Sequence, residues 1–103
     1  MKPVDLMNIN PLLADRARLA IMANLSLAGG PVDFNTLLEE LQLTKGNLSS
    51  HIRKLEEAGL VAVHKEFVDR KPRTTYVCTK KGKTEMQHYL NTIEALLKNK
   101  TMR

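Results

Sequence analysis

Two neighbouring segments of this chain carry side chains that could bind DNA. The first, TKGNLSSHIRKLEEAG from residue 44, predicts a helix whose apolar residues share one face: Leu48, Ile52 and Leu55. Amide, hydroxyl and basic groups occupy the remaining surface, namely Lys45, Asn47, Ser49, Ser50, Arg53 and Lys54. Amides can pair with adenine, and guanidinium groups with guanine or phosphate. Such a helix could therefore lie in a major groove, with Gly46 allowing close approach.

The second segment is a short basic loop, Asp69-Arg70-Lys71-Pro72-Arg73. It separates two runs rich in Val, Thr, Tyr and Phe, residues 60–67 and 74–79, which predict an antiparallel hairpin. We expect the loop to contact DNA through Arg70, Lys71 and Arg73. Narrow A·T-rich minor grooves attract guanidinium groups, which favours Arg70 there. Asp69 is expected to hold Arg70 or Arg73 by an ion pair. The alternative is a solvated turn with a weak surface pair.

Positive charge is concentrated in these same segments. The whole chain has a net charge of +5, but residues 1–43 contribute −2, residues 44–83 contribute +6 and residues 84–103 contribute +1. The helix face could be an ordinary solvated surface. However, its acidic residues are confined to the last turn, at Glu56 and Glu57, so the charge pattern favours an anionic partner.

The remaining composition predicts neither an enzyme nor a membrane protein. No phosphate loop or nucleophile motif is present, and Cys78 is a lone cysteine, expected to be a buried thiol. His51, His64 and His88 lack ligand spacing, so we expect no metal and no cofactor, and a structural role for His51. No apolar run reaches the ~20 residues of a membrane span, and no secretion signal is recognisable. These features predict a cytoplasmic location.

The first half of the chain predicts a helix-turn-helix. Residues 14–27 are apolar nearly all round and indicate a buried helix, and residues 32–34 suggest a short edge strand. Asn35 is expected to cap a second helix with Leu38 and Leu41 inward, and Thr44 to cap the third. The short connection between these two helices forces a steep crossing.

The C-terminal part predicts a hairpin packed on the helices through Val61, Val63 and Val77, followed by a helix over residues 80–98 capped by Thr79. That helix carries a heptad-like apolar seam with more surface than one neighbour needs, which predicts a dimer interface. The interface residues are expected to be Met86, Tyr89, Leu90, Ile93 and Leu97. The chain is predicted to form one domain over residues 1–103, mainly α with a small β-hairpin (α+β), a winged helix-turn-helix in the order helix-helix-helix-hairpin-helix.

The stretches LTKGNLSSHIRKLEEAGLV and FVDRKPRTTYVCTKKGK closely resemble small winged-helix transcriptional regulators related to the MarR and ArsR types. The resemblance runs from about Arg16 to Leu90. It implies a third helix in the major groove, a wing on the minor groove or backbone, and a homodimer formed by terminal helices. The chain departs from these families in having one short terminal helix and no cysteine metal motif. An effector pocket and a metal response are therefore not implied.

The sequence therefore predicts a homodimeric, sequence-specific DNA-binding transcriptional regulator whose partner is double-stranded DNA. One alternative is a winged-helix module that binds an acidic protein through its basic face. Another is a ligand-gated repressor, although no residue pattern supports a small-molecule effector.

Overall fold

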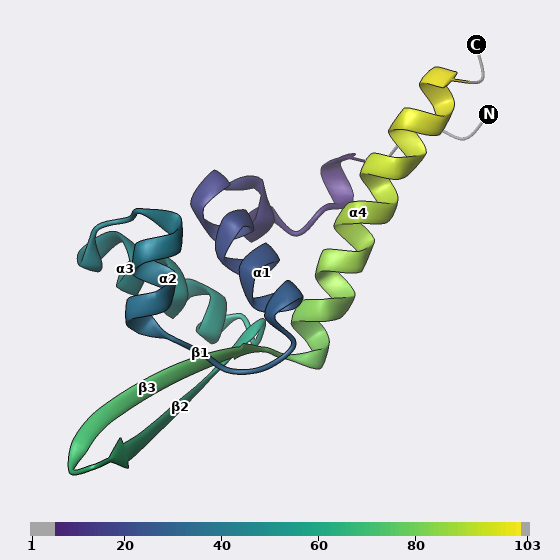
Figure 1. Cartoon of the computed structure of the whole chain (residues 1–103). Helices are drawn as coiled ribbons and strands as arrows, with labels where there is room; N and C mark the ends of the chain where they lie inside the picture. The colour runs from purple at the N-terminus through teal and green to yellow at the C-terminus, as the bar shows by residue number, and fades with distance from the viewer. Residues whose placement is uncertain (1–5, 102–103) are drawn as a thin grey trace.

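The computed structural model describes residues 6–101, with side chains to residue 98; residues 1–5 and 102–103 of the predicted domain lie outside the described residues. In order, the elements are η1 (Leu6–Asn8), η2 (Pro11–Ala14), α1 (Arg16–Ala28), β1 (Val32–Asp33), α2 (Phe34–Leu41), α3 (Lys45–Glu57), β2 (Val61–Val68), β3 (Lys71–Cys78) and α4 (Lys80–Thr101). The β2–β3 hairpin projects from the helices α1 to α3, and α4 extends the opposite way (Figure 1). The predicted α+β winged helix-turn-helix is confirmed.

Helix α1 forms the centre of the core, with Ile21, Met22 and Leu25 buried. It begins at Arg16 because the Asp15 carboxylate accepts a hydrogen bond from the backbone N–H of Arg18 at 3.0 Å. The expectation that this helix is buried nearly all round is wrong at its last turn, where Leu27 is 88% exposed.

Helix α2 is capped by Asp33, and the prediction of Asn35 is wrong. The Asp33 carboxylate accepts a hydrogen bond from the backbone N–H of Thr36 at 2.7 Å. Asp33 is extended because it pairs with Thr75 of β3, so the chain turns into the helix at Phe34. The innermost residue of α2 is Leu37, with no exposed surface, whereas the predicted Leu38 and Leu41 are half-buried against the core.

Helix α3 begins and ends as its sequence predicts. The Thr44 hydroxyl accepts a hydrogen bond from the backbone N–H of Asn47 at 3.1 Å. The predicted apolar stripe, Leu48, Ile52 and Leu55, is at most 4% exposed. Gly59 ends the helix with φ +78, and the backbone N–H of Leu60 donates to the carbonyl of Leu55 at 2.9 Å.

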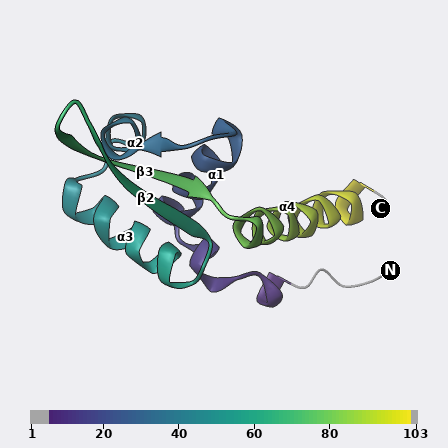
Figure 2. The same cartoon turned by 90° about the horizontal axis from the view of Figure 1, so that it is seen from below.

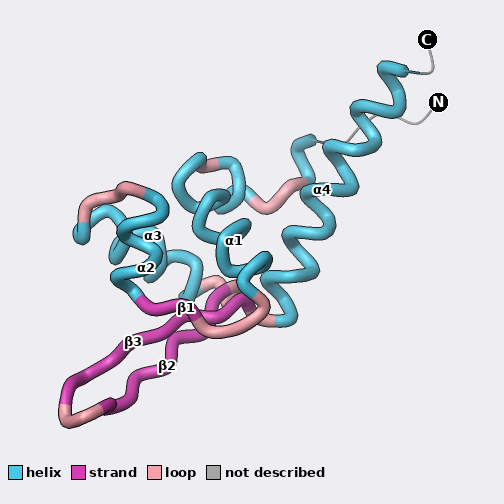
Figure 3. The backbone as a smooth tube through the Cα atoms, viewed as in Figure 1, coloured by secondary structure: helices cyan, strands magenta, loops and turns pink. Residues whose placement is uncertain are grey.

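The hairpin turn is shorter than predicted. It consists of Asp69 and Arg70, with φ of 51° and 66°, and β3 begins at Lys71 (Figure 3). Positive φ at both turn residues gives the twist that suits a two-residue hairpin. The predicted five-residue loop is therefore wrong, because Lys71, Pro72 and Arg73 pair with β2.

The three strands are antiparallel in the order β1-β3-β2. Cross-strand partners share a face, so the pairs Val61 with Cys78 and Val63 with Tyr76 lie on the face that joins the core. Val77 pairs with Ala62 and lies on the other face, so the expectation that it packs on the helices is wrong. The buried Cys78 thiol is confirmed.

Helix α4 is attached to the core at its first turns. The Thr79 hydroxyl accepts a hydrogen bond from the backbone N–H of Gly82 at 3.0 Å and donates to the carbonyl of Gly59 at 2.6 Å. Met86 is buried and Tyr89 is half-buried against the core. The helix continues to Thr101, beyond the predicted end at residue 98.

Gly82 permits this close packing of α4, so we predict that Gly82→Ala lowers the free energy of unfolding. A Cβ at this position would meet the carbonyl of Leu60, the Cys78 sulfur at 2.9 Å and the Met22 methyl at 3.0 Å. Overpacking of this kind costs about 1–3 kcal/mol, measurable by denaturant unfolding. Gly30→Ala is the control, since a Cβ there has open space. Equal stability of the two variants would contradict the prediction.

Candidate nucleic-acid interface

The outer face of α3 carries unpaired polar groups. All the predicted contact residues of this helix are exposed: Lys45, Asn47, Ser49, Ser50, Arg53 and Lys54. Within the part of the chain that the structure describes, their side chains make no hydrogen bond or ion pair. A Cβ at Gly46 would have no neighbouring atom within 4 Å, so packing does not require glycine there. The face is free to meet an external partner.

The back of α3 is held by Arg18 of α1. Its Nη1 lies 3.2 Å from Nδ1 of His51, and its Nε donates to the carbonyl of Leu12 at 2.9 Å. Arg18 also lies beside Asp15, and its backbone N–H is the main reason that the pKa of Asp15 falls below its ordinary value. These contacts give half-buried His51 the structural role that its position predicted.

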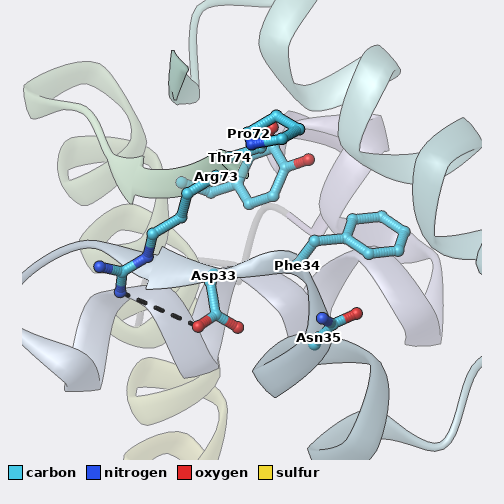
Figure 4. A pocket seen from close by; sticks show the side chains of 7 residues that line it. Asp33, Phe34, Asn35, Pro72, Arg73 and Thr74 are labelled. Carbon is cyan, nitrogen blue, oxygen red and sulfur yellow. Dashed lines mark ion pairs between the residues drawn. The ribbon is translucent and has the colours of Figure 1, made fainter. Parts of the chain in front are cut away.

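The wing residues have different surroundings. Arg70 is exposed in the two-residue turn at the tip of the hairpin. Lys71 is the first residue of β3 and pairs with Val68 of β2. Arg73 bends back towards the start of α2, where its Nη2 lies 3.9 Å from the Asp33 carboxylate (Figure 4). Among the described residues, no ion pair joins Asp69 to Arg70 or Arg73. That expectation is wrong because β1 places Asp33 beside β3, whereas Asp69 lies at the tip.

A cavity of about 490 Å³ lies between the wing and the start of α2. Asp33, Phe34, Asn35, Pro72, Arg73, Thr74 and Tyr76 line it. The Phe34 ring points away from the Asp33–Arg73 pair (Figure 4). Arg73 is the basic residue of this lining, and its charge is opposed by that of Asp33.

A second cleft, of about 250 Å³, lies between α3 and the hairpin and is lined by Ser49, Ile52, Arg53, Glu56, Val63, Lys65 and Tyr76. It brings two predicted α3 residues, Ser49 and Arg53, together with Lys65 of β2. The sequence did not predict a contact for Lys65, because this residue lies in the predicted strand of residues 60–67 and not in the basic loop. The available signal was its alternation with Val61 and Val63, which places it on the same face of the strand.

The predicted dimer residues divide into two groups. Met86 and Tyr89 pack on the protomer's own core. Ile93 is half-buried, whereas Leu90 is 53% and Leu97 is 58% exposed. Exposed Leu27 of α1 joins Met86 and Leu90 around a groove of about 390 Å³ between α1 and α4. The apolar surface that faces solvent therefore differs from the predicted seam.

Two other kinds of site are not found in the described residues. No cluster of three or more His, Cys, Asp or Glu side chains could hold a metal ion. No described helix is both long enough and apolar enough to cross a membrane.

The arrangement of α2, α3 and the wing is that of a winged helix-turn-helix, and comparison with known proteins agrees. Residues 17–97 match the winged helix DNA-binding domain family, and the chain belongs to that family. It is a winged-helix protein of the transcriptional-regulator class related to MarR and ArsR types, which is not a class of enzymes.

Particular relatives support this assignment. A transcriptional regulator homologue from Pyrococcus horikoshii is 37% identical, with a TM-score of 0.81, and 92% of each chain is covered. A MarR-like regulator from Thermotoga maritima is 26% identical, with a TM-score of 0.66, and the match covers all of this chain and 68% of that one. An uncharacterized protein from Methanocaldococcus jannaschii is 40% identical over 67 residues, covering 65% of this chain and 73% of that protein.

We predict that Asp33→Asn reduces the pH dependence of stability. The backbone N–H of Thr36, then its hydroxyl and the charge of Arg73, lower the pKa of Asp33 below its ordinary value of 3.8. Because the folded pKa is depressed, the carboxylate stabilises the fold above the unfolded pKa, and this contribution is lost as pH falls through the folded pKa. Asparagine keeps the cap but does not titrate. The free energy of unfolding should therefore fall less between about pH 7 and pH 3.

Asp69→Asn is the matched control, since it removes a wing-tip carboxylate that makes no ion pair in the described structure. Denaturant unfolding at each pH gives the measurement. If Asp33→Asn and the native protein lost equal stability on acidification, the stabilising role of the Asp33 charge would be refuted.

Proposed function

We propose that this protein is a sequence-specific DNA-binding transcriptional regulator that acts as a homodimer. The observation that carries the proposal is the free polar face of α3 opposite a buried apolar stripe. In a major groove, Asn47 and Ser50 would address base edges, and Arg53 would contact guanine or a phosphate. Lys45, Ser49 and Lys54 would contact the backbone on either side. Gly46 lets the first turn of the helix approach the bases.

The wing extends the same contact surface. Arg70 at its tip would enter the minor groove, and Lys71 would contact phosphate. Arg73 would contribute less, because Asp33 competes for its charge. The names of the Pyrococcus and Thermotoga relatives, both transcriptional regulators, agree with this proposal.

We assign the dimer contact to the outer face of α4. This helix contains residues 80–98, the dimerisation helix of the predicted single domain of residues 1–103. Leu90, Ile93 and Leu97 would meet the same residues of a second copy, as two-fold symmetry requires. Tyr89 would border this contact, and Met86 would support it from the protomer's core. Two recognition helices would then read a near-palindromic site with half-sites about 34 Å apart.

Selection of bound duplexes from a random pool tests the function. The native protein should enrich one near-palindromic sequence and bind it with an affinity that falls steeply as salt rises. Gly46→Ala should raise the free energy of unfolding by up to about 1 kcal/mol, because alanine favours a helix. The same variant should bind the selected duplex more weakly, because the added methyl group enters the contact surface. Failure to enrich any sequence would overturn the proposed function.

The dimer is tested by light scattering of the native protein and of a Leu90→Asp, Leu97→Asp double variant. Both side chains are more than half exposed, so the variant should fold while losing the apolar contact between protomers. We expect a dimer for the native protein and a monomer for the variant. His88→Asp is the control, because residue 88 lies about 200° around the helix from Leu90. A monomeric native protein would refute the proposed interface.

A further inference from the structure

Tyr76 separates two hollows beside the wing. This residue belongs to the linings of both the α2-side cavity and the α3-side cleft. Seen from below, α3 lies along β2, while β1 and α2 lie beside β3 (Figure 2). The α2-side cavity is therefore bounded by β1, α2 and β3, and the α3-side cleft by α3 and both strands of the hairpin, at the surface proposed to face DNA.

The two hollows differ in charge. The α2-side cavity contains Arg73 and Asp33, whose charges oppose each other across 3.9 Å. The α3-side cleft contains two cations, Arg53 and Lys65, and one carboxylate, Glu56. Neither cation forms an ion pair in the described structure. The charged side chains of the α3-side cleft therefore have a net positive charge, whereas those of the α2-side cavity cancel.

The strand register directs Lys65 into this cleft. Lys65 pairs with Thr74 and shares a face with Val63 and Tyr76, whereas Glu66 and Arg73 form the next pair on the opposite face. Ile52, Val63 and Tyr76 give the cleft an apolar floor, of which Ile52 is 4% and Tyr76 is 8% exposed. Apolar surroundings strengthen the attraction between a cation and an anion at the rim.

We propose that the cleft between α3 and β2 holds one backbone phosphate of bound DNA, with Lys65, Arg53 and Ser49 as donors. The inference rests on the proposed function and adds a residue outside the recognition helix and wing tip. A phosphate there contacts α3 and the hairpin together, so it fixes how far the helix enters the groove. It carries no sequence information by itself.

Glu56 limits where that phosphate lies. Its carboxylate lines the same cleft one helical turn after Ile52, whereas Ser49 comes one turn earlier than Arg53. An anion is repelled from the Glu56 end and favoured at the Ser49 end. Removal of the Glu56 charge should therefore strengthen DNA binding, opposite to the effect of removing Lys65.

The experiment compares native protein, Lys65→Ala, Glu56→Gln and Lys80→Ala on a duplex selected by the native protein and on a random duplex. Binding is measured over a range of salt concentrations. Lys65→Ala should weaken binding to both duplexes roughly fivefold to tenfold near 0.1 M salt and reduce the salt slope by about 0.9. Glu56→Gln should tighten binding to both duplexes. Circular dichroism of each variant should match that of the native protein, because the substituted side chains are exposed.

Lys80→Ala is the matched control, since it removes one exposed lysine at the start of α4, outside the cleft. If Lys65→Ala behaved like Lys80→Ala while the native protein bound DNA, the phosphate site would be refuted and the proposed function would stand. A change in preference between the two duplexes would also refute it, because a phosphate contact does not read sequence. Absence of DNA binding by the native protein would overturn both proposals.

Discussion

The pairing register of β2 with β3 is the constraint on which the charged surface depends. Side chains alternate between the faces of a strand, so a slip of one residue would exchange the two faces. The observed register puts Lys65 beside α3 and Arg73 beside Asp33. It also puts Val61 and Cys78 into the core, so burial of these side chains holds the register in place. The distribution of charge around the wing is therefore a consequence of core packing.

The same core fixes the orientation of α3. Burial of Leu48, Ile52 and Leu55 leaves no freedom to rotate the helix without exposing apolar surface. Arg18 adds a polar contact to His51 at the rear of the helix. The polar outer face of α3 makes no internal hydrogen bond or ion pair in the described structure, and the buried stripe and the Arg18–His51 contact position the helix. This separation lets the exposed residues change without loss of the fold.

Helix α4 divides its apolar residues between the protomer and solvent. Gly82 allows its first turns to approach Leu60 and Cys78, and Met86 continues this contact. Further along, the helix extends beyond the body of the protein, leaving Leu90 and Leu97 exposed (Figure 1). The heptad-like apolar seam in the sequence does not predict this division, because Met86 and Leu97 both fit the seven-residue repeat. How far a neighbouring helix extends decides which of them remains exposed.

Local patterns in the sequence determined the order of the elements, the Thr44 cap, the buried stripe of α3 and its polar outer face. Each depends on residues within a few positions of one another, where spacing and capping chemistry suffice. Tertiary structure decided the features that join distant residues. Asp33, not Asn35, caps α2 because β1 pairs with β3. The same pairing places Asp33 beside Arg73, so these two residues form an ion pair. Lys65 reached the cleft beside Arg53 only through the packing of the hairpin on α3.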